Sequence, residues 1–263
     1  MRLAVCVKQV PVSEQVSVDP VTNNLVREGT EGQVNPADLN ALQCACDLRE
    51  TAGGSVTALT MGPSDFEAAL RTALATGADQ GVLITDRAAA GSDTVVTARV
   101  LAGALNHLGG FDLILFGNES SDGATGQVGP MTAELLGLPH VTKVQDIQKE
   151  DENHVLVVKQ YKNQLFRLRL TLPAVVAVSF GCNEVALPTL MSQMEAEMQD
   201  LTVLSLDDVG LSPDQAGAAG SPTRVAGSYT REEEPCAEML SGSLEEQATA
   251  ILRLIQEGLE ENA

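Results

Sequence analysis

The sequence has little of the chemistry on which hydrolytic and metal-dependent enzymes rely. Its 263 residues include no tryptophan, two tyrosines and three histidines. The histidines, His107, His140 and His154, are scattered along the chain, and no pair has the spacing of metal ligands. We therefore predict no metal site, assign no catalytic residue, and favour a binding protein over a hydrolase.

Positive charge is also scarce. Lysine and arginine together number 16, against 36 aspartates and glutamates, and the formal net charge is −20. Such a chain repels nucleic acid and anionic lipid, so we expect neither as a partner. No apolar run reaches the roughly 18 residues of a membrane-spanning helix, so direct membrane insertion is not expected. A bound phosphate would have to rely heavily on backbone N–H groups at helix N-termini.

The cysteines follow no recognised framework. There are five of them, an odd number without a C-x-x-C pair, which fits neither a set of disulfides nor a zinc site. Cys44 and Cys46 lie two positions apart on an expected helix, so they point in different directions and are expected to be packing residues. Residues 1–15 lack the long apolar region and cleavage site of a secretory signal. We therefore expect a cytoplasmic protein.

Residues 1 to about 145 alternate short apolar runs with amphipathic stretches, which is typical of a parallel sheet covered by helices on both faces. The apolar runs are residues 3–7, 55–61, 81–85 and 112–117. Helices are expected from Pro36, from Ser64, from Ser92, and between Gln127 and Leu136. Ser64 and Ser92 are the expected N-caps of their helices. Right-handed crossovers would align the carboxyl ends of the strands along one edge, where a ligand is expected.

From His140 onward the pattern changes to closely spaced β-rich segments, with no room for helices between them. These segments predict an antiparallel extension of the sheet that ends in a buried strand at 174–180. The predicted fold class is α/β. It is a three-layer αβα arrangement around a mostly parallel, twisted sheet of the nucleotide-binding type, with an antiparallel extension and a C-terminal arm.

Two regions follow from the composition: a nucleotide-binding core at residues 1–206, and an extended C-terminal arm with a helix at residues 207–263. Residues 210–235 are rich in glycine, serine, proline and alanine and have little to bury. Ser243 and Glu246 form a capping box for an amphipathic helix. Its apolar face consists of Ala248, Ile251, Leu252 and Ile255. The helix can dock on its own domain or on a partner, and both interpretations stay open.

The strongest candidate for a binding site is the glycine-rich segment 117–137, which follows an apolar strand and opens a helix. Its glycines permit close approach of the backbone to a ligand, and the new helix presents free N–H groups. Uncharged donors come from Ser120, Ser121, Thr125 and Gln127. The segment is neither a P-loop nor a G-x-G-x-x-G fingerprint. The pattern favours nucleotide binding, and an ordinary long loop between strand and helix is the alternative.

Three other loops are expected at the same edge. Asn35 and Pro36 open the first helix, and Met61 ends the second strand. The segment Ser92-Asp93-Thr94 precedes the third helix, where Asp93 is a candidate acceptor for a ribose hydroxyl. Each of these also has a purely structural interpretation, as a helix cap or a turn, which stays open.

Seven segments, in order over nearly the whole chain, resemble a known family. They are residues 5–11, 34–42, 59–63, 70–79, 91–94, 122–130 and 220–225. Together they resemble the β subunit of electron transfer flavoproteins, whose fold agrees with the one predicted above. The resemblance implies a heterodimer with an α subunit that carries an FAD of its own. It also implies electron exchange with a dehydrogenase or another redox protein, with NADH as a candidate donor.

The resemblance also implies which residues hold a nucleotide. Before the glycine-rich loop they are Cys6, Asn35, Pro36, Ala37, Asp38, Met61, Ser92, Asp93 and Thr94. In that loop and the start of the next helix they are Asn118, Ser120, Ser121, Asp122, Gly123, Ala124, Thr125, Gly126, Gln127, Val128 and Gly129.

Two subclasses of the family differ in this nucleotide. Simple carriers hold AMP in a structural role, whereas the electron-bifurcating and nitrogen-fixation-associated branch holds a second FAD that takes a hydride pair from NADH. Residues 122–130 and 91–94 resemble the second branch. We therefore favour FAD, with AMP as the alternative. Rival interpretations are a stand-alone adenine-nucleotide-binding regulatory protein and a degenerate subunit kept only for assembly.

Several positions depart from the family pattern. Asn118 stands where the family has a lysine or arginine, which leaves a flavin diphosphate without that cation, and Ala124 replaces an acidic residue. Leu187, followed by Pro188, fits the leucine by which β subunits recognise their partners. The lysines expected after it are replaced by acidic residues, Glu195 and Glu197. A redox partner with a basic surface is therefore expected.

Overall fold

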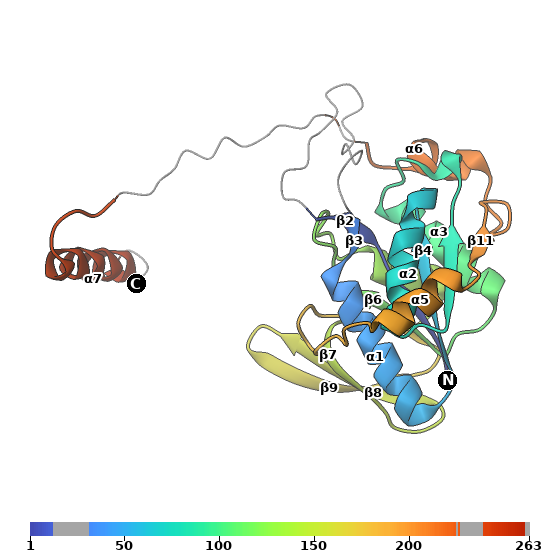
Figure 1. The fold of residues 1–263 in the computed structure, drawn as a ribbon, viewed down its shortest axis with the longest axis horizontal. Helices are drawn as coiled ribbons and strands as arrows, with labels where there is room; N and C mark the ends of the chain where they lie inside the picture. Colours follow the sequence, from blue (N-terminus) through green and yellow to red (C-terminus); the bar gives the residue numbers. More distant parts are fainter. Residues whose placement is uncertain (13–31, 225, 227–238, 261–263) are drawn as a thin grey trace. The chain divides into compact units, whose positions relative to one another are not determined.

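The computed structural model describes residues 1–12, 32–224, 226 and 239–260, and the chain divides into two compact units, Met1–Ala226 and Gly227–Ala263. The first unit is built on a nine-stranded sheet with the order β11-β5-β4-β1-β6-β10-β7-β8-β9 (Figure 1). Its strands are β1 (Arg2–Cys6), β4 (Ser55–Met61), β5 (Gln80–Ile84), β6 (Leu113–Gly117), β7 (His140–Lys149), β8 (His154–Tyr161), β9 (Gln164–Thr171), β10 (Ala174–Val178) and β11 (Thr202–Leu204). All neighbours from β11 to β7 pair in parallel, and β7, β8 and β9 pair antiparallel.

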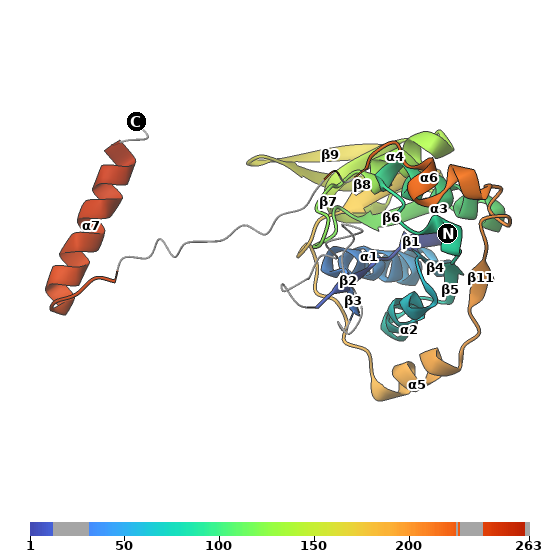
Figure 2. The same ribbon diagram turned by 90° about the horizontal axis from the view of Figure 1, so that it is seen from above.

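Helices cover both faces of this sheet, as predicted for an α/β fold. Figure 2 shows α1, α2 and α5 on one side, and α3, α4 and α6 on the other. Their bounds are α1 (Pro36–Ala52), α2 (Glu67–Thr76), α3 (Thr94–Leu108), α4 (Val128–Leu136), α5 (Leu190–Met198) and α6 (Gly217–Gly220). Successive residues of β1 alternate between two hydrophobic clusters, with Leu3 and Val5 in one and Ala4 and Cys6 in the other. The period of two along a strand therefore builds two cores, one beneath each layer of helices.

One predicted strand occupies an unexpected place. The buried strand expected at 174–180 is β10, but it lies in the parallel part of the sheet, between β6 and β7, and does not end the antiparallel extension. Every residue of β10 is buried, which suits a position covered on both faces. β9 forms the edge instead, and all of its residues except Leu170 are exposed.

Two helices start later in the sequence than predicted. Ser64 begins a short 3₁₀ turn (Ser64–Phe66), and α2 starts only at Glu67. The N-cap of α3 is Asp93 rather than Ser92, because the Asp93 carboxylate accepts from the N–H of Val96 at 3.0 Å. A small antiparallel pair, β2 (Gln9–Pro11) with β3 (Gly32–Val34), lies between β1 and α1 along the chain. It was not predicted from the sequence.

The first unit continues beyond residue 206, where composition suggested a boundary. Leu206, Val209 and Ala216 are buried in the cluster beneath α3. Gly217 has φ +58°, and a Cβ on it would lie 2.1 Å from the carbonyl oxygen of Ala88. Only glycine therefore permits this part of the chain to approach so closely. The segment after β11 is packed into the core as far as α6.

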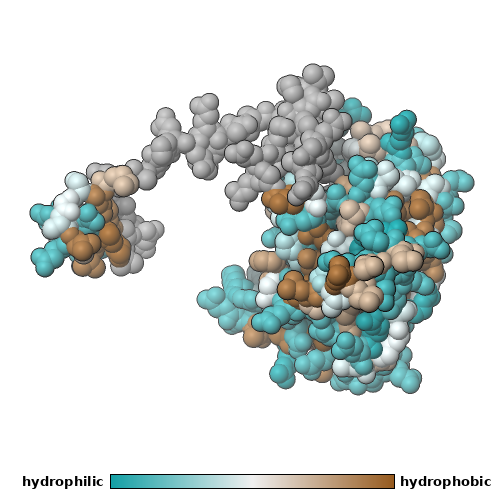
Figure 3. Space-filling model, viewed as in Figure 1, coloured by the Kyte–Doolittle hydropathy of each residue, from teal (hydrophilic) through white to brown (hydrophobic). Residues whose placement is uncertain are grey.

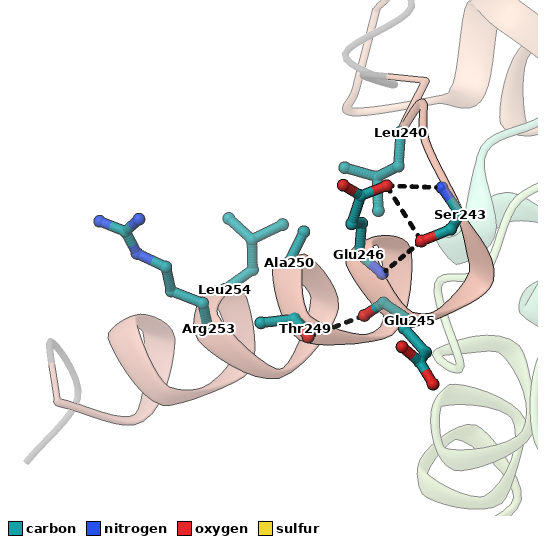
Figure 4. Close-up of a pocket in the computed structure, with 8 residues that line it drawn as sticks. All are labelled: Leu240, Ser243, Glu245, Glu246, Thr249, Ala250, Arg253 and Leu254. Atoms are coloured by element: carbon teal, nitrogen blue, oxygen red, sulfur yellow. Dashed lines mark hydrogen bonds between the residues drawn. The ribbon is translucent and has the colours of Figure 1, made fainter.

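The second unit contains α7 (Leu244–Glu260). The predicted capping box is confirmed: the backbone N–H of Ser243 donates to the Glu246 carboxylate at 2.7 Å, and the N–H of Glu246 donates to the Ser243 hydroxyl at 3.4 Å (Figure 4). Leu252 and Ile255, on the predicted apolar face, are exposed. Among the helices of the described residues, none is long and apolar enough to cross a membrane.

Candidate functional site

The site lies at the carboxyl ends of β1 and β6, at the point where the topology reverses. From β1 the chain continues to β4 on one side, and it later returns to β6 on the other side of β1. In open α/β sheets, ligands bind in the crevice outside such a switch point. Three chain segments meet here: the residues after β1, the start of α1, and the glycine-rich loop 118–127 that follows β6.

Asp38, in the first turn of α1, joins these segments. Its carboxylate accepts from the N–H of Lys8 at 2.8 Å and from the N–H of Gly117 at 3.0 Å. A Cβ on Gly117 would lie 2.3 Å from the Asp38 carboxylate, so this approach requires glycine. Burial raises the pKa of Asp38 to about 7, against the opposing hydrogen bonds from Asn35, Lys8 and Gly117.

Asn35 holds the glycine-rich loop in place. It occupies the N-cap position of α1, and Pro36 takes the first helical position as predicted, but the Asn35 side chain makes no capping hydrogen bond. Its amide instead donates to the carbonyl oxygen of Glu119 at 3.0 Å and accepts from the N–H of Ser121 at 3.2 Å. The side chain therefore links the start of α1 to the loop by two hydrogen bonds.

Lys8 brings a positive charge to the loop, and sequence reasoning missed it. Its ammonium lies 2.6 and 2.8 Å from the two carboxylate oxygens of Asp122, and 3.3 Å from the hydroxyl of Ser120. The Lys8 side chain is 39% exposed, whereas that of Asp122 is only 9% exposed. The loop therefore has a cation beside it, although Asn118 replaces the cation that the family carries, and this cation is paired with Asp122. Asn118 itself accepts from the N–H of Lys143 at 3.0 Å and so ties β6 to β7.

The loop backbone is tightly turned. Ala124 and Gly126 have left-handed φ angles of +46° and +61°. This conformation is strained for alanine but not for glycine. The loop then enters α4, whose second residue is Gly129, and a Cβ there would come within 3.4 Å of the Phe116 ring. The glycines thus permit both the turn and the packing of the N-terminus of α4 against β6.

The segment Ser92-Asp93-Thr94 is only partly drawn into this site. Thr94 donates to the side-chain oxygen of Gln127 at 3.0 Å, which links α3 to the end of the loop. Asp93 instead accepts from the N–H and hydroxyl of Thr223 and from the N–H of Val96. The Ser92 hydroxyl accepts from the N–H of Gly217 at 3.1 Å. These bonds favour the structural interpretation of Ser92 and Asp93, as anchors for residues 217–223, over a ribose contact.

Two further candidates lie along the same edge. Cys6 ends β1 with its side chain in the core, and burial, with a smaller effect of Asp38, raises the pKa of its thiol. It is therefore protonated and unreactive. Met61 ends β4, half-buried against the same cluster. The edge as a whole offers turned backbone, neutral hydroxyls and one ammonium, which suits the binding of a phosphorylated ligand.

A group of potential metal ligands lies elsewhere, at the turn between β7 and β8. It comprises Glu150, Asp151 and His154, whose ligand atoms lie within 4.8 Å of one another. Arg169 donates to both carboxylates, so both are already engaged by a cation of the chain. We assign no metal to it.

Comparison with known proteins gives a consistent result. Residues 22–208 match the model of the electron transfer flavoprotein domain. The chain is 36% identical over 247 residues to the electron transfer flavoprotein subunit beta of Thermoanaerobacterium thermosaccharolyticum, covering 94% of each chain. It is 36% identical over 244 residues to the Caffeyl-CoA reductase-Etf complex subunit CarD of Acetobacterium woodii, covering 92% of this chain and 93% of that one. It is 39% identical over 232 residues to Protein FixA of Azorhizobium caulinodans, covering 86% and 83% respectively.

The buried carboxylate predicts a pH-dependent stability. The native pKa of Asp38 lies near 7, above its ordinary 3.8, so the folded chain retains a proton that the unfolded chain has released. The resulting stabilisation is complete below about pH 4 and is lost as the pH rises through about 7. Between about pH 5 and pH 8, the unfolding free energy of the wild type should fall relative to that of Asp38→Asn by roughly 2–3 kcal/mol.

Urea denaturation at each pH measures this difference. The matched control is Asp65→Asn, which makes the same substitution at an exposed position after β4. A difference between wild type and Asp38→Asn that stays constant with pH would show that Asp38 titrates normally.

Proposed function

Because the chain belongs to the electron transfer flavoprotein family, as a β subunit with a role in electron transfer, we propose that its glycine-rich loop holds FAD, with AMP as the alternative nucleotide. The observation that carries this proposal is the convergence of Lys8, the loop 118–127 and the N-terminus of α4 at the switch point of the sheet. When bound, the flavin supplies the electron and hydride chemistry, and the protein supplies binding and electrostatics.

The residues at this edge fit a diphosphate. The Lys8 ammonium would neutralise phosphate charge that the N–H groups at the start of α4 alone would leave largely uncompensated. The hydroxyls of Ser120, Ser121 and Thr125 are further donors on the same loop. Lys8 is held by Asp122, so a bound phosphate competes with that carboxylate for the cation. The net gain in affinity therefore depends on how far the phosphate replaces Asp122 as the partner of the Lys8 ammonium.

The electron-bifurcating branch accounts best for the loop. Residues 122–130 resemble the pattern of that branch, and the relatives include a subunit of a Caffeyl-CoA reductase-Etf complex and a Protein FixA. We therefore assign this chain to a cytoplasmic heterodimer with an α subunit that carries a further FAD. With FAD bound, this subunit would take one hydride, that is two electrons, from NADH, and the heterodimer would pass the electrons on to another redox protein.

The C-terminal part of the chain is suited to hold the α subunit. Residues 207–220 pack on the first unit, so we assign that contact to the second unit, Gly227–Ala263, with α7 as the element that docks. Leu252, Leu254 and Ile255 are exposed on this helix. Figure 4 shows that Leu240, Ala250 and Leu254 lie on one side of it. An amphipathic helix with such an exposed apolar stripe gains most of its stability when a partner covers the stripe.

A second surface is suited to the redox partner. Leu187 is 90% exposed, and Leu190, Met191, Met194 and Met198 are exposed on α5, where Figure 3 shows hydrophobic side chains gathered. Pro188 lies between Leu187 and α5. Glu195 and Glu197 are exposed on the same helix. Apolar, polarizable side chains next to carboxylates fit a partner that has an apolar pocket with a basic rim.

The nucleotide content of the purified αβ heterodimer tests the first proposal. Two FAD per heterodimer are expected, measured by flavin absorbance and by chromatography of the released nucleotides. One FAD with one AMP would contradict the second flavin and support a simple carrier. An absence of nucleotide from this subunit would favour a role in assembly alone. A stable homo-oligomer that binds ATP without an α partner would favour a regulatory protein.

The role of Lys8 is tested by Lys8→Gln, which keeps a polar side chain, one atom shorter, and removes the charge. The dissociation constant for FAD should rise about tenfold, the loss expected for one charge-assisted contact of roughly 1.5 kcal/mol. Calorimetric titration of the flavin-depleted heterodimer measures it. Lys162→Gln, at the exposed turn between β8 and β9, is the matched control. Equal affinities for the two variants would remove Lys8 from the site.

The partner surface is tested by Leu187→Ala. The KM for the redox partner should rise several-fold with little change in kcat, because the leucine contributes to docking and not to the flavin. Leu165→Ala removes a comparably exposed leucine from β9 and serves as the control. An unchanged KM for Leu187→Ala in steady-state assays would show that docking occurs elsewhere.

A further inference from the structure

Two cysteines from distant parts of the chain meet beside the sheet. Cys44 lies in the middle of α1, and Cys182 lies in the turn that follows β10. Both are free and partly buried, and both pack against the same hydrophobic cluster. The side chain of Asn183, the residue after Cys182, donates to the sulfur of Cys44 at 3.2 Å. Cys46, two positions further along α1, is instead buried in the hydrophobic cluster beneath the helix. Cys44 and Cys182 pack against the same cluster, so the prediction that Cys44 and Cys46 are packing residues is confirmed.

The backbone around Cys182 is already fixed against α1 by one buried side chain. The side-chain oxygen of Asn40 accepts from the N–H of Gly181 at 2.9 Å, and its amide nitrogen donates to the carbonyl oxygen of Asn183 at 3.0 Å. Asn183 in turn donates to the carbonyl oxygen of Asn40 at 3.0 Å and to the sulfur of Cys44 at 3.2 Å. Both neighbours of Cys182 are therefore anchored one helical turn before Cys44.

This arrangement holds the chain around Cys182 against the helix that carries Cys44. A bridge forms without backbone movement only where two cysteines are held close together by the surrounding structure. Here the polar contacts of Asn40 and Asn183 hold them, so the approach does not depend on the sulfur atoms alone. The hydrogen bond from Cys44 lowers the pKa of the Cys182 thiol, against the effect of burial, and Cys182 is the more exposed of the two. Cys182 therefore has the character of an attacking thiolate.

We propose that Cys44 and Cys182 form a reversible disulfide when the protein meets a peroxide. The Cys182 thiolate attacks one peroxide oxygen, which forms a sulfenic acid and releases hydroxide that is protonated to water. The Cys44 thiol then attacks the sulfenic sulfur, its proton passes to the leaving hydroxyl, and a second water departs. In sum, one hydrogen peroxide is reduced to two waters while two thiols are oxidised to one disulfide. A dithiol reductant reverses the reaction by exchange.

The bridge would fix the chain segment that leads into α5. Ala186 already donates its N–H to the side chain of Gln43 at 2.9 Å, and Leu187 follows directly. A covalent bond at Cys182 would restrict the conformations open to Leu187 by fixing the chain five residues before it. This consequence rests on the partner surface proposed above. The disulfide itself does not, because it depends only on contacts within this chain.

Mass spectrometry of the purified αβ heterodimer tests the proposal. The complex is treated with hydrogen peroxide, remaining thiols are blocked with N-ethylmaleimide, and the chain is digested without reductant. We expect a peptide in which Cys44 is linked to Cys182, a mass loss of about 2 Da, and reversal of both by dithiothreitol. Because Cys44 and Cys46 lie in one tryptic peptide, Cys46→Ser serves as the matched control and should give the same linked product.

Two variants make the chemistry falsifiable. In Cys44→Ser, the sulfenic acid at Cys182 loses its resolving partner and should be trapped by dimedone. In Cys182→Ser, which alters a partly exposed turn position, no bridge and no trapped Cys44 should form. A wild-type chain that accumulates sulfenic acid at Cys182 without a linked peptide would overturn the proposal, as would linkage of Cys182 to Cys46. Because the readout is a covalent mass, it fails or succeeds independently of which nucleotide the chain binds.

Discussion

The structure depends on a single buried carboxylate. From the first turn of α1, Asp38 accepts one hydrogen bond from Lys8, two residues after β1, and another from Gly117, the last residue of β6. These elements are distant in sequence but define the switch point of the sheet. Burial of the charge is costly, which is why the pKa of Asp38 rises, so this carboxylate contributes the geometry of the switch point rather than net stability. Around it, Asn35 and Lys8 connect the start of α1 and the end of β1 to the glycine-rich loop by hydrogen bonds.

Several features of the fold could be predicted from the sequence, because they are local. The apolar runs of β1 and β10 are buried on both faces, so they predict a parallel sheet whatever the strand order. The place of β10 between β6 and β7 is set by long-range pairing that no local pattern reports. Likewise, Ser92 and Asp93 are both good capping residues. The choice of Asp93 depends on Ser92 being engaged by Gly217, from a segment more than one hundred positions further along the chain.

The candidate site shows the same division. The glycines of the loop were visible because left-handed backbone and close approach require them, as at Gly117 and Gly126. Lys8 was missed because one lysine after a strand carries no pattern. Its significance arises only when the loop brings Asp122 within 2.6 Å of it. In a chain with a net charge of −20, each cation near a candidate phosphate site has a large effect on the local field. Lys8 is such a cation, whereas Asn118 is uncharged.

Exposed apolar side chains on this chain indicate that it works together with other chains. Large apolar residues are exposed on β9, on α5 and on α7, whereas the two clusters on either side of the parallel sheet are well buried. Patches of this kind on a soluble fold mark surfaces that other chains cover. A protein that transfers electrons must bind its partners so that the redox centres lie at defined distances. Its own core positions only its own side of each interface. In the proposed function, the elements around Asp38 would position the nucleotide, and α5 and α7 would present the surfaces that the partners cover.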